Sequence, residues 1–335
     1  MIIQENSSLK SFNTFGIAVT ARYFAKAHSV EALQTLLTHY QSPLILGGGS
    51  NILFTKNVAG LVIHNCISGI EKVAETDDHV FLKIGAGENW HQLVLYCIKN
   101  NYAGIENLSL IPGTVGAAPI QNIGAYGVEL KDVLECVAGL EISPTALLST
   151  PFFIRGDDCE FGYRDSIFKR ALKNKVVITQ VTLRLNKKPV FHLEYGAIRD
   201  KIQDKPLSIK TISDAVIAIR QEKLPDPKLI GNAGSFFKNP IISAALFSSL
   251  QTDYPNIPFF QEANGDVKIP AGWLIEQCGF KGKRFGDIGV HEHQALVLIN
   301  YGGGTGLAIK ELSKTIQETV FRRFKILLNT EVNII

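Results

Sequence analysis

The residues that could do chemistry begin with three glycines and two small polar residues at 47–51, directly after the apolar run at 44–46. Glycines let consecutive backbone N–H groups converge on one anion, and Ser50 and Asn51 can add side-chain hydrogen bonds. A tight hairpin turn would have the same composition. This loop alone therefore leaves a turn and an anion site equally open.

A second loop of small residues favours the anion site. The stretches 111–119 (IPGTVGAAP) and 122–127 (NIGAYG) carry tiny side chains where a packed helix would need bulk. Such residues let a flat or extended ligand approach the backbone closely. Together the two loops favour a ligand that contains a pyrophosphate.

The loops match neither of the common nucleotide fingerprints. At 85–90 a GxG follows an apolar run, but Trp90 stands where the third glycine is needed, and there is no GxxxxGK[ST] sequence. A dinucleotide would therefore be bound in another way. The glycine run at 302–306 precedes a helical pattern, and we interpret it as a flexible connection and cap.

Strand and helix patterns alternate around these loops, which predicts an α/β or α+β protein. Apolar residues repeat at helical spacing in several segments, and N-cap residues such as Ser29 precede them. The expected strands are 21–25, 44–46, 60–63 and 80–84. The expected helices are 29–38, 90–100, 211–221, 241–251, 271–277 and 306–324. We expect domain boundaries near residues 70 and 224.

Composition indicates a globular protein without a nucleic-acid or membrane partner. The 335 residues are 46% hydrophobic and 19% charged, with a net charge of +3. The five cysteines form no CxxC pair, so we expect buried free thiols in a reducing compartment. His291 and His293 are expected to pack or face solvent rather than bind a metal. With no secretory leader and no long apolar run, a cytoplasmic location is expected.

Seven blocks of the sequence closely resemble the UDP-N-acetylenolpyruvoylglucosamine reductase family, in order and over nearly the whole chain. They are NTFG at 13–16, GGGSN at 47–51, PGTVGAAPIQNIGAYG at 112–127, FGYRDSIFK at 161–169, KLPDP at 223–227, GNAGSFFKNP at 231–240 and QALV at 294–297. The FGYRDSIFK form, together with Tyr195, is similar to the longer subtype of the family, which has a substrate-covering tyrosine loop.

The resemblance implies an α+β, FAD-binding fold of the vanillyl-alcohol-oxidase type. Two FAD-binding subdomains would span 1–70, with 326–335 packing nearby, and 71–224, and a substrate domain would span 225–325. FAD would be bound without a covalent link, because neither glycine loop holds a His or Cys. The implied FAD contacts are Gly47, Gly48, Gly49, Ser50, Asn51, Gly113, Thr114, Gly116, Ala117 and Gly124.

The implied reaction is the reduction of an enolpyruvyl ether on UDP-N-acetylglucosamine, with NADPH as co-substrate. Hydride addition leaves an enediolate-like charge on the neighbouring carboxylate, which preorganised donors must stabilise. By resemblance Arg164 and Glu331 flank this carboxylate, with the pKa of Glu331 raised by burial and by the substrate's charge. Ser235 would protonate the adjacent carbon.

The remaining implied contacts hold the diphosphate and the sugar. They are Tyr195, Lys223, Asn239, Lys281 and Gln294. One position departs from the family pattern: Asn333 stands where the family often has an arginine near the flavin. A monomer without nucleic-acid or membrane partners is expected.

Two other functions remain open at this level. One is another flavin oxidoreductase of the same fold, acting on a sugar or an alcohol, and the other is a catalytically silent protein that binds FAD or a nucleotide sugar. The presence of Arg164, Ser235 and Glu331 at family spacing argues against both.

Overall fold

A computed structural model describes residues 2–40, 42–142, 149–194, 196–203 and 205–335. The chain divides into two compact units, each built from separate segments. Unit 1 comprises Met1–Ser7, Thr20–Gly49 and Val58–Glu222, and unit 2 comprises Ser8–Val19, Ser50–Asn57 and Lys223–Ile335. The division into three domains near residues 70 and 224 stays a prediction.

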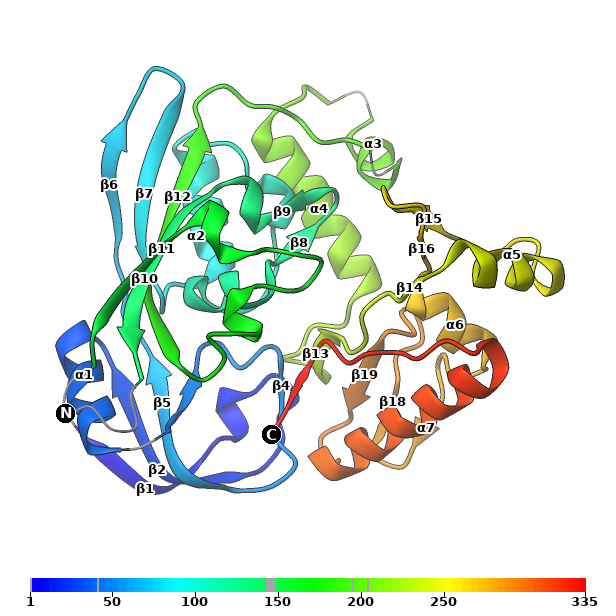
Figure 1. The fold of residues 1–335 in the computed structure, drawn as a ribbon, viewed down its shortest axis with the longest axis horizontal. Coiled ribbons are helices and arrows are strands. Elements are labelled where there is room, and N and C mark those ends of the chain that lie inside the picture. Colours follow the sequence, from blue (N-terminus) through cyan, green and yellow to red (C-terminus); the bar gives the residue numbers. More distant parts are fainter. Residues whose placement is uncertain (1, 41, 143–148, 195, 204) are drawn as a thin grey trace. The chain divides into compact units, whose positions relative to one another are not determined.

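The first sheet of unit 1 has the strand order β1-β2-β5-β3, and β2, β5 and β3 run parallel (Figure 1). Its strands are β1 (Ile3–Ser8), β2 (Thr20–Ala27), β3 (Leu44–Leu46) and β5 (Val58–Asn65). The helix α1 (Val30–His39) buries Leu33 and Leu36 in one cluster with Ala25 and Ile63 of this sheet. The parallel strand β3 ends at Leu46, and the first glycine loop begins at the next residue.

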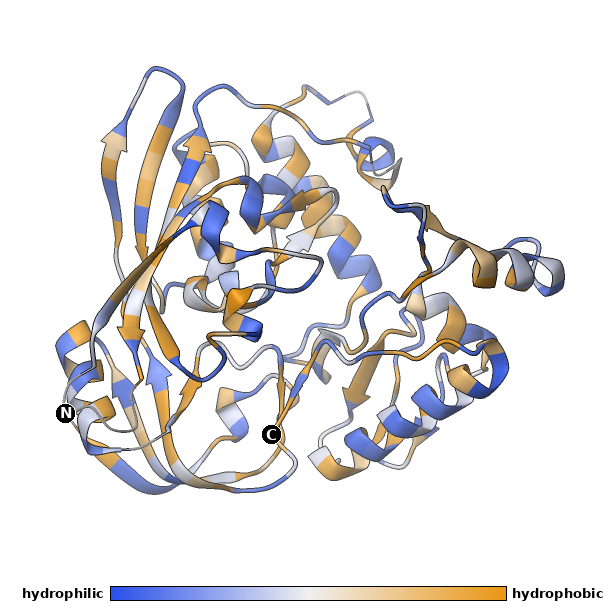
Figure 2. Cartoon of the chain, viewed as in Figure 1, coloured by the Kyte–Doolittle hydropathy of each residue, from blue (hydrophilic) through white to orange (hydrophobic). Residues whose placement is uncertain are grey.

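The second sheet of unit 1 is antiparallel, with the order β11-β10-β12-β7-β6. Its strands are β6 (Ile70–Glu75), β7 (His79–Gly85), β10 (Leu134–Glu141), β11 (Pro151–Arg155) and β12 (Val176–Asn186). Buried Val181, Leu183 and Leu185 alternate with polar residues along β12. Figure 2 shows both hydrophobic and hydrophilic colours along this strand. This alternation turns one face of the strand into the core, as expected for a half-buried strand.

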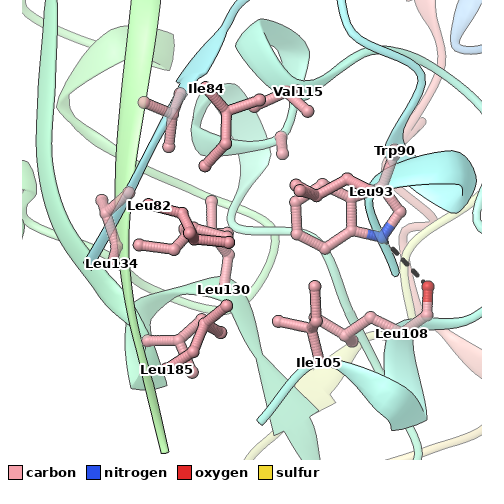
Figure 3. Packing of buried hydrophobic residues seen from close by; sticks show 14 of the residues in the cluster. Leu82, Ile84, Trp90, Leu93, Ile105, Leu108, Val115, Leu130, Leu134 and Leu185 are labelled. Atoms are coloured by element: carbon pink, nitrogen blue, oxygen red, sulfur yellow. Dashed lines mark hydrogen bonds between the residues drawn. The ribbon is translucent and has the colours of Figure 1, made fainter. Parts of the chain in front are cut away.

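The main core of unit 1 lies between this sheet and α2 (Trp90–Lys99). Figure 3 shows Trp90 among Leu82, Ile84 and Leu93, with its indole N–H donating to the carbonyl oxygen of Leu108 at 3.0 Å. Trp90, which stands where a GxGxxG motif would have its third glycine, is therefore a buried residue of the core.

Short elements and two helices complete unit 1. They are the 3-10 helices η2 (Glu106–Leu108), η3 (Val115–Ala117), η4 (Pro119–Gln121), η5 (Leu130–Asp132), η6 (Gly156–Cys159) and η7 (Ile167–Lys169), the hairpin strands β8 (Gly124–Ala125) and β9 (Val128–Glu129), and the helices α3 (Gly196–Ile202) and α4 (Ile209–Lys223).

Unit 2 is built on the sheet β13-β19-β18-β17, with two smaller sheets, β14-β16-β15 and β20-β4. The strands are β4 (Ile52–Leu53), β13 (Gly231–Ser235), β14 (Ile241–Ile242), β15 (Phe260–Gln261), β16 (Val267–Lys268), β17 (Arg284–Phe285), β18 (Ile288–Val290), β19 (Val297–Asn300) and β20 (Asn333–Ile334). The helices are η1 (Lys10–Phe12), α5 (Ala244–Asp253), α6 (Ala271–Gln277) and α7 (Gly306–Phe324).

The predicted helices are confirmed, with one correction. Side chains of Ser29, Asn89 and Thr305 cap α1, α2 and α7. The helix expected at 241–251 begins only at Ala244, because Ile241 and Ile242 pair with β16 as a strand. Among the described residues no helix is long and apolar enough to cross a membrane.

The glycines at 302–306 serve close packing as well as capping. A Cβ added at Gly306 would lie 1.7 Å from the carbonyl oxygen of Phe54, and one at Gly304 would lie 2.4 Å from Cγ2 of Ile288. Only a residue without a side chain allows the start of α7 to approach these neighbours.

The expectation of buried thiols is only partly right. All five cysteines are free, but only Cys97 and Cys159 are buried, whereas Cys66, Cys136 and Cys278 are half-buried. Burial raises the pKa of Cys159 to about 12, with a smaller contribution from Asp158, so this thiol stays protonated at neutral pH.

Candidate functional site

The two glycine loops meet inside unit 1. A Cβ added at Gly47 would lie 2.4 Å from Oγ1 of Thr114, and one at Gly48 would lie 2.8 Å from Cα of Gly113. Gly48 thus packs against the backbone of Gly113 and Gly47 against the side chain of Thr114, at distances that leave no room for a Cβ. The two loops singled out from the sequence are therefore in contact, and their binding of a pyrophosphate stays a prediction.

The second loop is fixed by backbone hydrogen bonds to the segment after β7. The amides of Val115 and Gly116 donate to the carbonyls of Glu88 and Ala86 at 2.9 and 2.8 Å. A Cβ at Gly116 would lie 2.5 Å from the Cβ of Ala86. Local packing against Ala86 therefore requires a glycine at position 116.

Arg164 lies at the tip of a tight turn in which Gly162 and Asp165 bridge each other. Its φ of +53° is in the left-handed region, which is costly for a residue with a side chain. Its Nη2 donates to the carbonyl oxygen of Gly124 at 2.6 Å, and its guanidinium lies 5.4 Å from the ring centroid of Tyr163. The turn therefore directs the fork of Arg164 onto β8.

Two buried polar residues hold this turn in place. Asn122, itself at a φ of +45°, donates to the carbonyl of Gly162 at 3.2 Å and to Oε2 of Glu129 at 2.9 Å. Ser166 donates to the carbonyl oxygen of Ile120 at 2.7 Å. The end of the second loop and the Arg164 turn are therefore one hydrogen-bonded assembly in unit 1.

The sequence analysis missed a second guanidinium near Arg164. Arg220 lies on the buried face of α4, four residues after Val216 and seven after Ser213, and its buried Nε has no hydrogen-bond partner among the described residues. The available signal was an arginine at a position where the helical repeat calls for an apolar residue.

In unit 2, Ser235 follows an irregular stretch of β13. The register of β13 against β19 shifts between Asn232 and Ser235, and Gly234 takes a φ of +68°. The side chain of Asn232 accepts from the amide of Gly234 at 2.9 Å and donates to the carbonyl of Pro225 at 3.1 Å. This bulge changes the direction of the strand at its end. Bulges are common next to functional sites, where they reorient side chains.

Glu331 lies beside the Ser235 segment. Its amide donates to the carbonyl oxygen of Phe236 at 2.8 Å, and Phe237 forms a bridge with Thr330. The carbonyl of Glu331 accepts from Nδ2 of Asn51 at 3.2 Å. The structure thus brings Asn51, the end of β13 and Glu331 together within unit 2.

Asn333, at the position that departs from the family pattern, has a local structural contact. Its backbone amide and its Nδ2 both donate to the carbonyl oxygen of Asn51, at 3.1 and 3.0 Å. These bonds continue the pairing of β20 with β4. Asn333 therefore secures the C-terminal strand, whatever it contributes to a cofactor.

Three of the predicted substrate contacts gather around α6. Oδ1 of Asn239 accepts from the amide of Ala271 at 2.9 Å, and Oε1 of Gln294 lies 3.0 Å from where a Cβ on Gly272 would stand. Lys281 pairs with Glu276 at 2.9 Å.

The two remaining predicted substrate contacts, Lys223 and Tyr195, are not part of this group around α6. Lys223 is an exposed residue at the end of α4, and Tyr195 lies outside the described residues.

The described part of the chain holds no cluster of metal-ligating side chains. His291 is buried, and its Nδ1 accepts from the amide of His293 at 3.4 Å. A pocket in unit 2 is lined by residues 16–19, 54–57 and 302–306, and it contains none of the predicted site residues. We assign it no part in the site, because it brings together none of the groups described above.

Comparison with known proteins gives this arrangement its context. A protein-family model for an FAD-binding domain matches residues 21–143, and one for the C-terminal domain of UDP-N-acetylenolpyruvoylglucosamine reductase matches residues 226–335. Among solved structures, the UDP-N-acetylenolpyruvylglucosamine reductase of Thermus caldophilus aligns with 99% of both chains at a TM-score of 0.70 and 23% identity, which shows a shared fold. The predicted α+β, FAD-binding fold is confirmed.

Sequence relatives match over their full length. UDP-N-acetylenolpyruvoylglucosamine reductase of Amoebophilus asiaticus is 57% identical, covering 100% of both chains, and that of Flavobacterium johnsoniae is 49% identical with the same coverage. The matches to the C-terminal-domain model and to the FAD-binding model both fall within these alignments. The chain therefore belongs to the UDP-N-acetylenolpyruvoylglucosamine reductase family.

Proposed function

We propose that this protein is a flavin-dependent oxidoreductase that reduces the enolpyruvyl ether of UDP-N-acetylglucosamine to UDP-N-acetylmuramate, with NADPH as co-substrate. The observation that carries the proposal is the 57% identity, over both full chains, to a relative named UDP-N-acetylenolpyruvoylglucosamine reductase. The reaction supplies a peptidoglycan precursor, so we place the protein in cell-wall biogenesis and thereby in cell shape and division.

The two glycine loops of unit 1 fit FAD. The loops at 47–48 and 113–116 meet with no bulky side chain between them, and glycine backbone suits a diphosphate. FAD would be held by Gly47, Gly48, Gly49, Ser50, Asn51, Gly113, Thr114, Gly116, Ala117 and Gly124. When bound, FAD would supply the hydride-transfer chemistry that links NADPH to the terminal carbon of the enol ether.

Arg164 would hold the substrate carboxylate. Its planar fork can donate two parallel hydrogen bonds to a carboxylate, and its permanent charge opposes the negative charge that develops there during reduction. The bond from its Nη2 to the carbonyl of Gly124 fixes the fork before substrate arrives. Glu331 would flank the same carboxylate, and it must carry a proton to help rather than repel.

Ser235 would protonate the neighbouring carbon. A bulge precedes Ser235, which pairs with Val297 at the end of β13, and Gly234 leaves open space beside it, with no atom within 4 Å of an added Cβ. A serine hydroxyl is a weak acid, so it serves only where the carbon is strongly basic and water is excluded. Tyr195, Lys223, Asn239, Lys281 and Gln294 would hold the diphosphate and the sugar.

We further propose a monomer in the cytoplasm, where NADPH and nucleotide sugars are found, with no nucleic-acid or membrane partner. The domain limits 1–70, 71–224 and 225–325 belong to the same proposal. Light scattering of the purified protein tests the oligomeric state.

The function itself is tested by purifying the protein and following NADPH absorbance. The protein should be yellow, acid precipitation should release the colour, and NADPH should be consumed rapidly only after the enolpyruvyl nucleotide is added. Rapid consumption with oxygen alone, or with a simple alcohol or sugar, would instead support another flavin oxidoreductase. A protein that binds FAD but consumes no NADPH would be a silent binding protein.

A further inference from the structure

Asn107 is a buried polar residue that joins two segments distant from each other in the sequence. It is 1% exposed and lies in η2, directly after Glu106. Its Nδ2 donates to the carbonyl oxygens of Tyr126 and His192, each at 3.0 Å. Its Oδ1 is buried and has no hydrogen-bond partner among the residues that the structure describes. Asn107 therefore acts through its two N–H donors alone.

The short helix η2 gives these donors a fixed position. Directly after Asn107, the carbonyl oxygen of Leu108 accepts from the indole N–H of Trp90 at 3.0 Å in the core (Figure 3). The hydroxyl of Ser109 shares a hydrogen bond of 2.7 Å with that of Ser213 on α4. The backbone around Asn107 is thus joined to both α2 and α4.

The first segment that Asn107 holds is the turn of the β8–β9 hairpin. Tyr126 and Gly127 form this turn, with φ values of +51° and +83°. Positive φ at both positions suits a two-residue hairpin turn but is costly for a tyrosine, so contacts from elsewhere must hold the turn. The bond from Asn107 to the Tyr126 carbonyl is such a contact. The same hairpin includes Gly124, whose carbonyl accepts from Nη2 of Arg164 at 2.6 Å.

The second segment that Asn107 holds is 191–194. Its apolar residues Phe191 and Leu193 pack against a buried cluster from α3 and α4, and the side chain of the β8–β9 turn packs against the same cluster. His192 lies between these two residues, and its carbonyl oxygen accepts the second bond from Asn107. The two segments therefore share one apolar cluster and are joined by one buried amide.

We propose that Asn107 is a positioning residue for the reaction, which keeps two parts of the substrate site in register. One part is the β8–β9 hairpin, which supports Arg164, and the other is the segment 191–194, which leads to Tyr195. The proposal rests on the proposed function, in which Arg164 holds the substrate's carboxylate and Tyr195 helps to hold its diphosphate and sugar. A substrate that reaches both parts binds best when their spacing is fixed in advance.

The first test is a titration of oxidised, FAD-loaded Asn107→Asp with nucleotides, monitored by flavin absorbance without NADPH. An ionised carboxylate has no donor and would place its charge against two carbonyl oxygens. Binding of the enolpyruvyl nucleotide should weaken by about tenfold or more. UDP-N-acetylglucosamine, which lacks the carboxylate and reaches only one of the two parts, should lose about threefold or less.

A pH series separates lost donors from a damaged fold. The carboxyl group of Asn107→Asp would be buried, which raises its pKa, and once protonated it regains one O–H donor. Binding of the enolpyruvyl nucleotide, relative to the unmodified protein, should therefore improve as the pH falls from about 8 to about 6. Ionisable neighbours such as Glu106, His192 and Tyr126 are present in both proteins, so the ratio removes their titration. Asn107→Leu, which has no donor at any pH, should weaken binding without this recovery.

The matched control is Asn100→Asp. Asn100 likewise donates from Nδ2 to a backbone carbonyl, that of Tyr96 at 2.8 Å, but it does so at the exposed C-terminal end of α2. This variant should bind both nucleotides like the unmodified protein at every pH.

Equal weakening for both nucleotides in Asn107→Asp would overturn the proposal, since Asn107 would then serve one part of the site only. Absence of recovery at low pH, or failure of both Asn107 variants to fold or to keep FAD, would also overturn it and make Asn107 structural. If the unmodified protein neither binds nor reduces the enolpyruvyl nucleotide, the proposed function fails, and this inference fails with it. If it does both and the Asn107 variants behave identically to it, only the role of Asn107 fails.

Discussion

Arg164 in unit 1 and Ser235 in unit 2 are positioned by opposite uses of left-handed backbone. Arg164 itself takes a φ of +53°, whereas at Ser235 the preceding residue, Gly234, takes a φ of +68°. This conformation costs a residue with a side chain about 1–2 kcal/mol and costs glycine almost nothing. In unit 1 the strain therefore lies in Arg164 itself, whereas in unit 2 the left-handed backbone falls on Gly234, which tolerates it.

The difference teaches how each side chain depends on its surroundings. The Arg164 turn is held by bonds from other segments, from Asn122 to the carbonyl of Gly162 and from Arg164 itself to Gly124. The Ser235 bulge is held mainly from within, by Asn232 three residues earlier. We expect changes near Arg164 to act through contacts and changes near Ser235 to act through backbone conformation.

The largest effect is expected at Ser235. Ser235→Ala should leave reduction of the flavin by NADPH nearly unchanged and slow its reoxidation by the enolpyruvyl nucleotide by about a hundredfold to ten-thousandfold, the span for a lost general acid. Ser235→Cys should recover part of the rate, because a thiol can donate a proton. Rapid-mixing absorbance of the flavin measures both steps. Equal slowing of both would show that Ser235 supports the cofactor site instead.

Arg164→Lys should have the next largest effect. Lysine keeps the charge but loses the planar fork. We expect kcat/KM to fall by an amount that corresponds to about 2 kcal/mol or more of lost transition-state stabilisation, comparable to a lost oxyanion donor. Steady-state kinetics with the enolpyruvyl nucleotide measures it. Near-normal kcat/KM would mean that charge alone is enough or that Arg164 is structural.

Gly124→Ala should act on Arg164 through contact. The added Cβ would lie 3.1 Å from Nη1 of Arg164 and 3.0 Å from the carbonyl of Val128, so the fork must shift. We expect kcat/KM to fall by about tenfold, less than for Arg164→Lys, because a small displacement keeps the charge and both donors. The control is Gly60→Ala, where an added Cβ meets nothing within 4 Å. If both variants behave alike, Gly124 does not position Arg164.

Gly234→Ala should have the smallest effect of the four changes. We expect a modest loss of stability and a slower reaction of the flavin with substrate. Its φ of +68° would strain an alanine by about 1–2 kcal/mol, although the added Cβ meets nothing within 4 Å. Gly265→Ala is the matched control, with a φ of +88° and the same open space. Urea unfolding should show similar losses for both, but only Gly234→Ala should slow flavin reoxidation by substrate. Equal rates would separate Ser235 from its bulge.

Features set by local sequence were predicted well. The helices at 271–277 and 306–324 have the predicted bounds, because their apolar spacing and, for the second, the cap at Thr305 lie in the segment itself. The two glycine loops were singled out by composition alone. The family motifs further led to the FAD-binding fold, which the comparisons confirm.

Features that depend on distant partners were not predicted. The strand β14 replaced the start of a predicted helix because β16, about 25 residues later, supplies its hydrogen bonds. The strands β10, β11 and β12 were missed, since their register is set by pairing across the sheet. The lack of a hydrogen-bond partner for the buried Nε of Arg220, among the residues that the structure describes, likewise becomes visible only in the folded chain.

The central claim, that this chain reduces an enolpyruvyl nucleotide, is tested most directly by the product of a single reaction. The protein is reduced with one equivalent of NADPH without oxygen, mixed with the enolpyruvyl nucleotide, and the nucleotide is analysed by mass spectrometry. The account predicts a product heavier by two hydrogen atoms, formed as the flavin colour returns. A flavin that stays reduced, with the nucleotide unchanged, would contradict it.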